Sequence, residues 1–125
     1  MSLRSPLGRA RGLGSAKSGV VSFWQQRVTA VALVPLALWF AISLIALSGA
    51  DYDVARAWLA KPLNATLMVL TLGTGLWHAV LGLQVVIEDY VGCAGKWISL
   101  IGIRLLGAFL AVFTTVSILK VAVGG

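Results

Sequence analysis

The chain has 125 residues, of which 59% are hydrophobic and only 11% are charged. A soluble domain usually carries about 25% charged residues, and a chain of this size has too little interior to hide so much apolar surface. Composition therefore excludes an ordinary soluble domain and predicts a single all-α domain, residues 1–125, embedded in membrane lipid. The net charge is +6. Half of the cations precede or open the first apolar run, which is typical of a cytoplasmic flank and argues against a nucleic-acid partner.

The hydropathy pattern predicts three transmembrane helices, at about 22–48, 64–90 and 96–121. At 1.5 Å per residue each is long enough to cross a hydrocarbon core of about 30 Å with some tilt. The first span is also too long for the apolar region of a signal peptide. Pro35 lies inside it, which membrane helices tolerate when neighbours satisfy the freed carbonyl. The segment between the first two spans is polar, and we expect it to form a loop.

The basic tail, residues 1–21, predicts a cytoplasmic N-terminus. Three crossings then place the first loop outside, the loop near Cys93 inside and the C-terminus outside. A single cysteine excludes an internal disulfide, and we interpret Cys93 as an inert small residue. Arg104 lies near the cytoplasmic end of the third span, where an arginine commonly extends its head towards the lipid headgroups.

One histidine, His78, falls near the middle of the second span. Ionisable residues at this depth cost roughly 2.5–3.5 kcal/mol on insertion scales, so they usually mark a function. At 100° per residue, six neighbours fall within about 60° of His78, and five of them are small or polar: Thr71, Thr74, Gly75, Gly82, Val85 and Asp89. These neighbours predict a cleft of low side-chain volume beside the imidazole.

Two interpretations of His78 remain open at this point. It can make an interhelical hydrogen bond, with the glycines allowing close helix packing. Alternatively, it can be an axial ligand of a haem iron, because imidazole is a usual iron ligand and a flat macrocycle needs such a cleft. The chain offers no well-placed second ligand. A six-coordinate haem would therefore be shared with another chain, in a hetero-oligomer or a symmetric dimer.

Two further polar sites lie near the cytoplasmic side. Arg27, about one turn inside the first span, either extends to the headgroups or directs its donors at a carboxylate such as a haem propionate. Glu88, Asp89 and Tyr90 close the second span. They are either solvated interfacial residues or a phenol donor beside a carboxylate, which suits a lipophilic carbonyl substrate such as a quinone. Twelve residues separate His78 from Tyr90, roughly 18 Å along a helix, so the two would serve neighbouring sites.

Residues 78–91, HAVLGLQVVIEDYV, resemble the second-helix motif of the small hydrophobic membrane anchor of bacterial succinate dehydrogenase, respiratory complex II. The shared pattern is a histidine, a glycine, a Gln-Val pair and then Asp-Tyr-Val, with histidine and tyrosine 12 residues apart. A second match is residues 26–30, QRVTA, with Phe23 and the LGR at 7–9 before it.

This resemblance implies a membrane anchor that binds haem b and ubiquinone and passes electrons from succinate oxidation to the quinone. By the family pattern His78 is the haem axial ligand and the iron's only ligand from this chain, and Arg27 lies near the haem propionates. Tyr90 and Asp89 form the quinone site. The implied partners are the flavoprotein subunit, which holds FAD, the subunit that holds the iron–sulfur clusters, and the cytochrome b anchor subunit, which shares the haem and packs with this chain in a helical bundle. The implied location is the bacterial cytoplasmic (inner) membrane, in electron transport and the tricarboxylic acid cycle.

Other functions fit parts of the sequence. A quinol:fumarate reductase anchor runs the reverse reaction and has the same features. A small proton-coupled carrier would use His78 as a relay, although no inverted repeat or broken helix pair is evident. An anchor without any cofactor would leave His78 without a role. No group for succinate chemistry is present, so we expect no enzymatic activity from the isolated chain.

Overall fold

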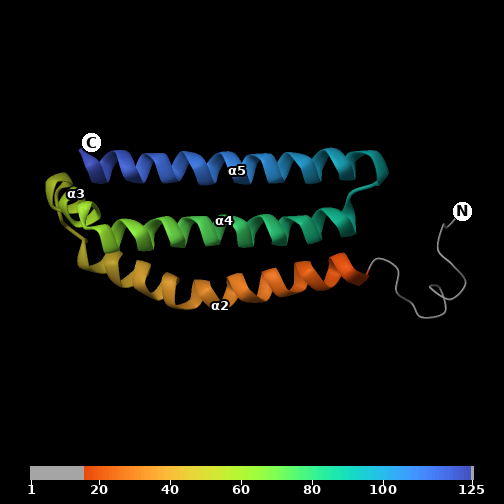
Figure 1. Ribbon diagram of the computed structural model, residues 1–125, viewed down its shortest axis with the longest axis horizontal. Coiled ribbons are helices and arrows are strands. Elements are labelled where there is room, and N and C mark those ends of the chain that lie inside the picture. Colours follow the sequence, from red (N-terminus) through yellow and green to blue (C-terminus); the bar gives the residue numbers. More distant parts are fainter. Residues whose placement is uncertain (1–15, 125) are drawn as a thin grey trace, which may run out of the picture.

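The computed structural model describes residues 16–124, with side chains from Val20 onwards, and the predicted tail at 1–21 lies mostly outside this range. The described residues form helices and no strand, as predicted (Figure 1). The helices are α2 (Ala16–Ala46), α3 (Tyr52–Ala60), α4 (Pro62–Tyr90) and α5 (Cys93–Val123).

Three of these helices are long and apolar enough to cross a membrane, over Val20–Ala46, Pro62–Tyr90 and Cys93–Val123. The prediction of three spans is therefore confirmed, with each end within a few residues of the expected one. Helix α2 passes through Pro35 without a break. Between α2 and α3 the chain turns at Gly49, whose φ of +82° is a conformation that other residues rarely adopt.

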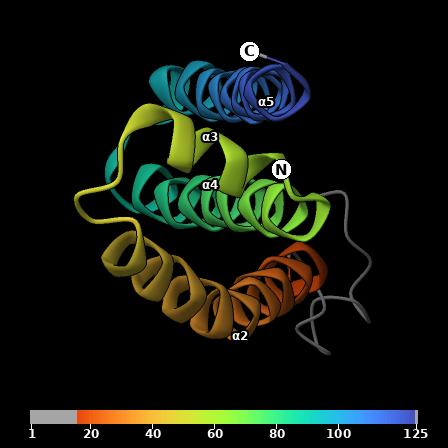
Figure 2. The ribbon, with the colours of Figure 1, turned by 90° about the vertical axis from the view of Figure 1, so that its left-hand side faces the viewer.

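Helix α4 is the centre of the molecule, because α2 and α5 each pack against it from opposite sides (Figures 1 and 2). Within residues 16–124, the backbones of α2 and α5 do not come close to each other, because α4 lies between them (Figure 2). The start of α2, the end of α4 and the start of α5 lie at one end of the molecule, as the alternating topology requires (Figure 1). Cys93 is exposed at that end.

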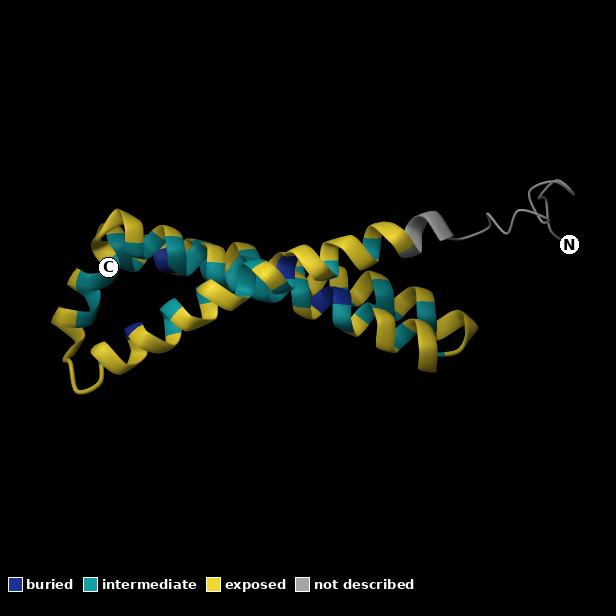
Figure 3. Ribbon diagram, turned by 90° about the horizontal axis from the view of Figure 1, so that it is seen from below, coloured by how far each residue is buried: buried dark blue, intermediate teal, exposed yellow. Residues whose placement is uncertain are grey.

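This arrangement buries very little apolar surface within the described residues. Only Val80, Leu81 and Ile118 are buried apolar side chains (Figure 3). All other large apolar side chains of the three long helices in the described residues are half-buried or exposed. Such a surface is stable only in lipid or against another apolar protein surface. Packing against a partner anchor in a helical bundle remains a prediction.

The expectation of a loop between the first two spans is wrong, because most of that segment forms α3. Asp51 is the N-cap, and its side chain accepts a hydrogen bond from the backbone N–H of Val54 at 3.0 Å. Asp53 adds a negative charge to the first turn, where the helix dipole favours it. Trp58 holds α3 on the bundle by stacking on Trp39 of α2, with ring centroids 5.7 Å apart.

Close contact between α4 and α5 depends on Gly107. A Cβ atom at this position would lie 2.5 Å from Cγ2 of Val80. Val80 is 6% exposed and β-branched, so its side chain has little freedom to move away. Small residues at such crossings let membrane helices approach closely.

We predict that Gly107→Ala lowers the stability of the α4–α5 pair by about 1–3 kcal/mol relative to Gly102→Ala, because it overpacks the crossing. Gly102 is the matched control, since a Cβ there meets nothing within 4 Å. Denaturation of the two variants in mixed detergent micelles, followed by circular dichroism, measures the difference. Equal stability of the two variants would show that the crossing is looser than the structure indicates.

Candidate functional site

The side chain of His78 faces α2, where it meets the hydroxyl of Thr29. Nδ1 of His78 and Oγ1 of Thr29 lie 2.9 Å apart. Thr29 is 9% exposed and His78 is half-buried. The sequence identified His78 but missed Thr29 as its partner. This contact is the only side-chain hydrogen bond that joins α2 to α4 within the described residues.

The neighbouring contacts give the same antiparallel register. One turn to either side of the Thr29–His78 pair, Leu33 faces Gly75 and Gln26 faces Gly82. Cβ atoms built on the two glycines would lie 3.9 Å from Cδ2 of Leu33 and 3.8 Å from Nε2 of Gln26. On this side, side chains of α2 lie against Gly75 and Gly82. The cleft of low side-chain volume beside the imidazole remains a prediction. The glycines serve close helix packing.

The direction of the Thr29–His78 hydrogen bond depends on which ring nitrogen carries the proton. Oγ1 of Thr29 also lies 2.8 Å from the carbonyl oxygen of Gln25 and 3.0 Å from that of Gln26. A carbonyl oxygen can only accept. If the hydroxyl donates to one of these two oxygens, Nδ1 of His78 must carry a proton and donate it to Oγ1. In the neutral ring Nε2 then has a free lone pair, the form that binds a metal.

Gln26 is a second residue of α2 at this interface that the sequence did not identify as functional. Its Oε1 is buried and has no hydrogen-bond partner in the described part of the chain. Buried polar atoms are nearly always paired in folded proteins. Oε1 of Gln26 thus lacks the hydrogen-bond donor that a buried oxygen normally has.

Arg27 does not join His78. It lies two residues before Thr29, so its Cα is about 160° around α2 from the face that meets α4. Its guanidinium carbon lies 4.9 Å from the ring centroid of Phe23, a cation–π contact on an exposed surface. A group that uses both Arg27 and His78 must therefore reach around the edge of α2.

Asp89 and Tyr90 are adjacent and exposed at the last turn of α4, and Tyr90 is 84% exposed. No basic residue lies in this turn, which instead carries Glu88 and Asp89. Anions at a helix C-terminus oppose the helix dipole at a cost of about 0.3–1 kcal/mol each. The stability of α4 alone therefore does not explain these acids, and both Tyr90 and Asp89 are free to meet a ligand.

Glu88 belongs to a different set of contacts from Asp89. Nε2 of Gln84 donates to Oε1 of Glu88 at 3.0 Å, and Nη2 of Arg104 donates to Oε1 of Gln84 at 3.0 Å. Gln84, about 120° around α4 from His78, therefore faces α5. Arg104 is exposed and donates a hydrogen bond to Gln84 of α4. The expectation that Arg104 extends towards the lipid headgroups did not include this bond.

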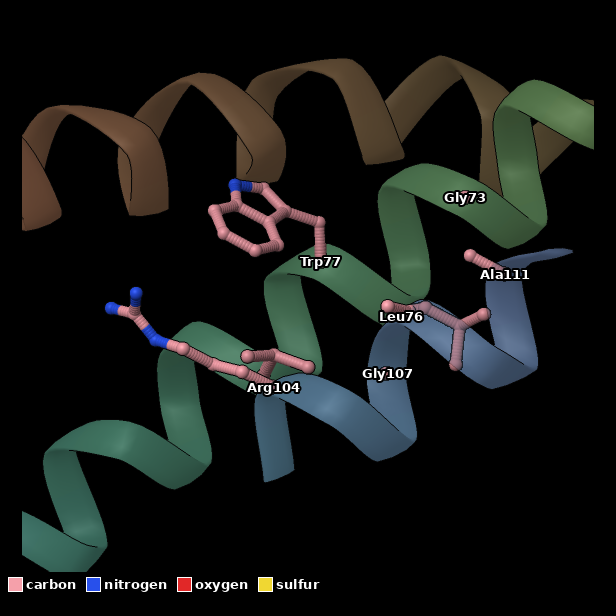
Figure 4. A pocket seen from close by; sticks show the side chains of 8 residues that line it. Gly73, Leu76, Trp77, Arg104, Gly107 and Ala111 are labelled. Carbon is pink, nitrogen blue, oxygen red and sulfur yellow. The ribbon is translucent and has the colours of Figure 1, made fainter. Parts of the chain in front are cut away.

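A cavity of about 210 Å³ lies between α4 and α5, and Arg104 stands at its edge (Figure 4). Its other lining residues are apolar or small: Gly73, Leu76, Trp77, Val80, Gly107, Ala108 and Ala111. The four from α4 lie between about 100° and 160° around the helix from His78. This cavity is therefore separate from the imidazole site. No cluster of three His, Cys, Asp or Glu side chains occurs within the described residues, so His78 is a lone candidate ligand.

The fold and the site define a multi-pass helical membrane protein with one imidazole held between two spans. Comparison with known proteins adds the family. Residues 1–119 match the succinate dehydrogenase/fumarate reductase transmembrane subunit family. Three similar proteins are each named succinate dehydrogenase hydrophobic membrane anchor subunit. That of Rickettsia bellii is 39% identical over 72% of this chain and 72% of its own length. The Rickettsia conorii protein is 37% identical over 66% and 67%, and the Paracoccus denitrificans protein 33% over 69% and 67%.

The chain therefore belongs to the succinate dehydrogenase/fumarate reductase transmembrane subunit family. The resemblance noted from residues 78–91 is confirmed, and the chain is a membrane anchor of the succinate dehydrogenase type. Membership of this family argues against the proton-coupled carrier. The roles of His78, Arg27, Asp89 and Tyr90 remain predictions.

Proposed function

We propose that this chain is the haem b- and ubiquinone-binding anchor of a succinate:quinone oxidoreductase. The observation that carries the proposal is the 2.9 Å contact between Nδ1 of His78 and Oγ1 of Thr29. With the proton on Nδ1, Nε2 would be left as a lone-pair donor to a metal. The quinol:fumarate reductase anchor is the alternative direction of the same chemistry. The names of the relatives favour succinate dehydrogenase.

The residues around His78 fit a haem ligand. Metal-bound histidines almost always donate their other ring N–H to an oxygen, which fixes the ring and its protonation. Thr29 provides such an oxygen. The ring is half-buried, so a group from outside the chain has access to part of it. A bound haem b supplies a one-electron carrier beside the quinone site.

A second protein ligand to the haem would come from a partner subunit, because His78 is the only histidine in the sequence. The exposed apolar surface of the three long helices supports packing against such a partner, the cytochrome b anchor subunit. Arg27, on the exposed side of α2, would direct its donors at a haem propionate. The flavoprotein subunit with its FAD and the iron–sulfur subunit would carry out succinate oxidation outside the lipid.

Tyr90 and Asp89 would bind the ubiquinone. The phenol O–H of Tyr90 can donate a hydrogen bond to a quinone carbonyl oxygen, which positions the ring for reduction. Quinone reduction to quinol takes two electrons and two protons. The exposed carboxylate of Asp89, at the water-facing end of α4, can pass protons to the quinone oxygens. The basic tail would hold this end on the cytoplasmic side of the bacterial inner membrane.

We predict that His78→Ala removes the b-type α-band from the dithionite-reduced minus oxidised spectrum of the purified complex, because the iron loses its ligand from this chain. The amounts of all four subunits in the membrane and succinate oxidation with a soluble dye acceptor control for assembly. An unchanged band in an assembled complex would exclude His78 as the ligand.

We predict that Tyr90→Phe lowers kcat/KM for ubiquinone by about fivefold, the value of one lost hydrogen bond of about 1 kcal/mol. Succinate oxidation by the dye acceptor should stay at the wild-type rate. Tyr52→Phe is the matched control, since Tyr52 is also exposed but opens α3 at the opposite end of the bundle. Equal losses in both assays would point to an assembly defect in place of a quinone role.

A further inference from the structure

We infer that Thr29 is a positioning residue for the haem ligand: its hydroxyl holds the proton of His78 on Nδ1 and lowers the midpoint potential of the iron bound at Nε2. This inference rests on the proposed haem function. It adds a role for α2, a helix that supplies no iron ligand itself.

The first step is the direction of the hydrogen bond. Oγ1 of Thr29 has acceptors at 2.8 and 3.0 Å on its own helix and Nδ1 of His78 at 2.9 Å on α4. When the hydroxyl donates to a carbonyl of its own helix, as threonine commonly does, only a protonated Nδ1 can complete the contact with the ring. A protonated Nδ1 satisfies the hydroxyl and the ring together. The backbone carbonyl oxygens of α2 thus favour a proton on Nδ1 of His78, which lies on α4.

The second step is the strength of this constraint. Thr29 is 9% exposed, so little water competes for Nδ1 or for the hydroxyl. The β-branched side chain has few rotamers in a helix, and those that bond the preceding carbonyls are favoured. Leu33 and Gln26, packed over Gly75 and Gly82, fix the register that brings Thr29 opposite His78. Oγ1 is therefore held in place by the helix pair.

The third step is the effect on the iron. An acceptor at Nδ1–H increases the basicity of Nε2, as other oxygen partners do for metal-bound histidines. A more basic ligand stabilises the ferric form more than the ferrous form. Loss of such a partner typically costs 10–100-fold in metal affinity or activity. A tenfold change in the ferric-to-ferrous preference corresponds to about 59 mV for one electron.

The simpler alternative is that the contact only joins the two helices, with the hydroxyl of Thr29 donating to an unprotonated Nδ1. The neutral ring would then carry its proton on Nε2, and Thr29 would not prepare that nitrogen for a metal. Two measurements therefore separate the alternatives.

The first measurement uses the haem-free full chain in lipid bilayers, with histidine labelled with ¹⁵N. His78 is the only histidine, so its two ring nitrogens give the only signals. We expect a protonated Nδ1 and an unprotonated Nε2 in the wild type and in Thr29→Ser, and a shift of population towards protonated Nε2 in Thr29→Val. A wild-type ring protonated on Nε2 would overturn the inference without any variant.

The second measurement is a redox titration of the b-type band in the assembled complex. Thr29→Val should keep the band and raise its midpoint by about 59 mV or more, the equivalent of a tenfold change, whereas Thr29→Ser should stay near the wild type. Thr115→Val is the control, because the hydroxyl of Thr115 bonds only to a carbonyl of its own helix α5. An unchanged midpoint in Thr29→Val would refute the role of Thr29. A band that survives His78→Ala would instead refute the haem proposal itself.

Discussion

An imidazole in the middle of a membrane span must find partners for both of its nitrogens, because lipid offers none. In this chain the hydroxyl of Thr29 provides the partner for Nδ1 of His78. In the proposed function, Nε2 would meet the haem iron. This requirement connects the helix packing to the function, since α2 must lie at one register on α4 for the hydroxyl to meet the ring. The glycines at positions 75 and 82 permit that register, one turn to either side of the histidine.

Other features of the described residues also lack favourable partners within this chain. Helix α4 is covered on two sides by helices whose backbones do not come close to each other, and few side chains are buried within the described residues (Figures 2 and 3). The buried Oε1 of Gln26 has no partner there, and the last turn of α4 carries acids that the helix dipole disfavours. Each feature is a local cost for an isolated chain. Together they fit a subunit whose stability and chemistry depend on assembly, as expected for a family of transmembrane subunits.

The sequence predicted the three spans and the helix face of His78 because both depend on periodicity within one segment. It did not predict α3, although Val54, Trp58 and Leu59 place apolar side chains on one face of a helix of nine residues. Asp51 as an N-cap was a further clue. The sequence also did not predict that Thr29 contacts His78, although residues 26–30 are part of the match to the family. Periodicity tells which face of a helix is polar, but not how two helices slide along each other. A slide of one residue, about 1.5 Å, would bring a different side chain opposite the ring.

The most direct test of this account is an experimental structure of the chain assembled with its partner subunits and their prosthetic groups. The account predicts that Nε2 of His78 is bonded to a haem iron whose other axial ligand comes from a partner subunit, while Nδ1 stays within hydrogen-bond distance of Oγ1 of Thr29. A ring whose Nε2 faces only aliphatic side chains, with any porphyrin bound elsewhere, would contradict it.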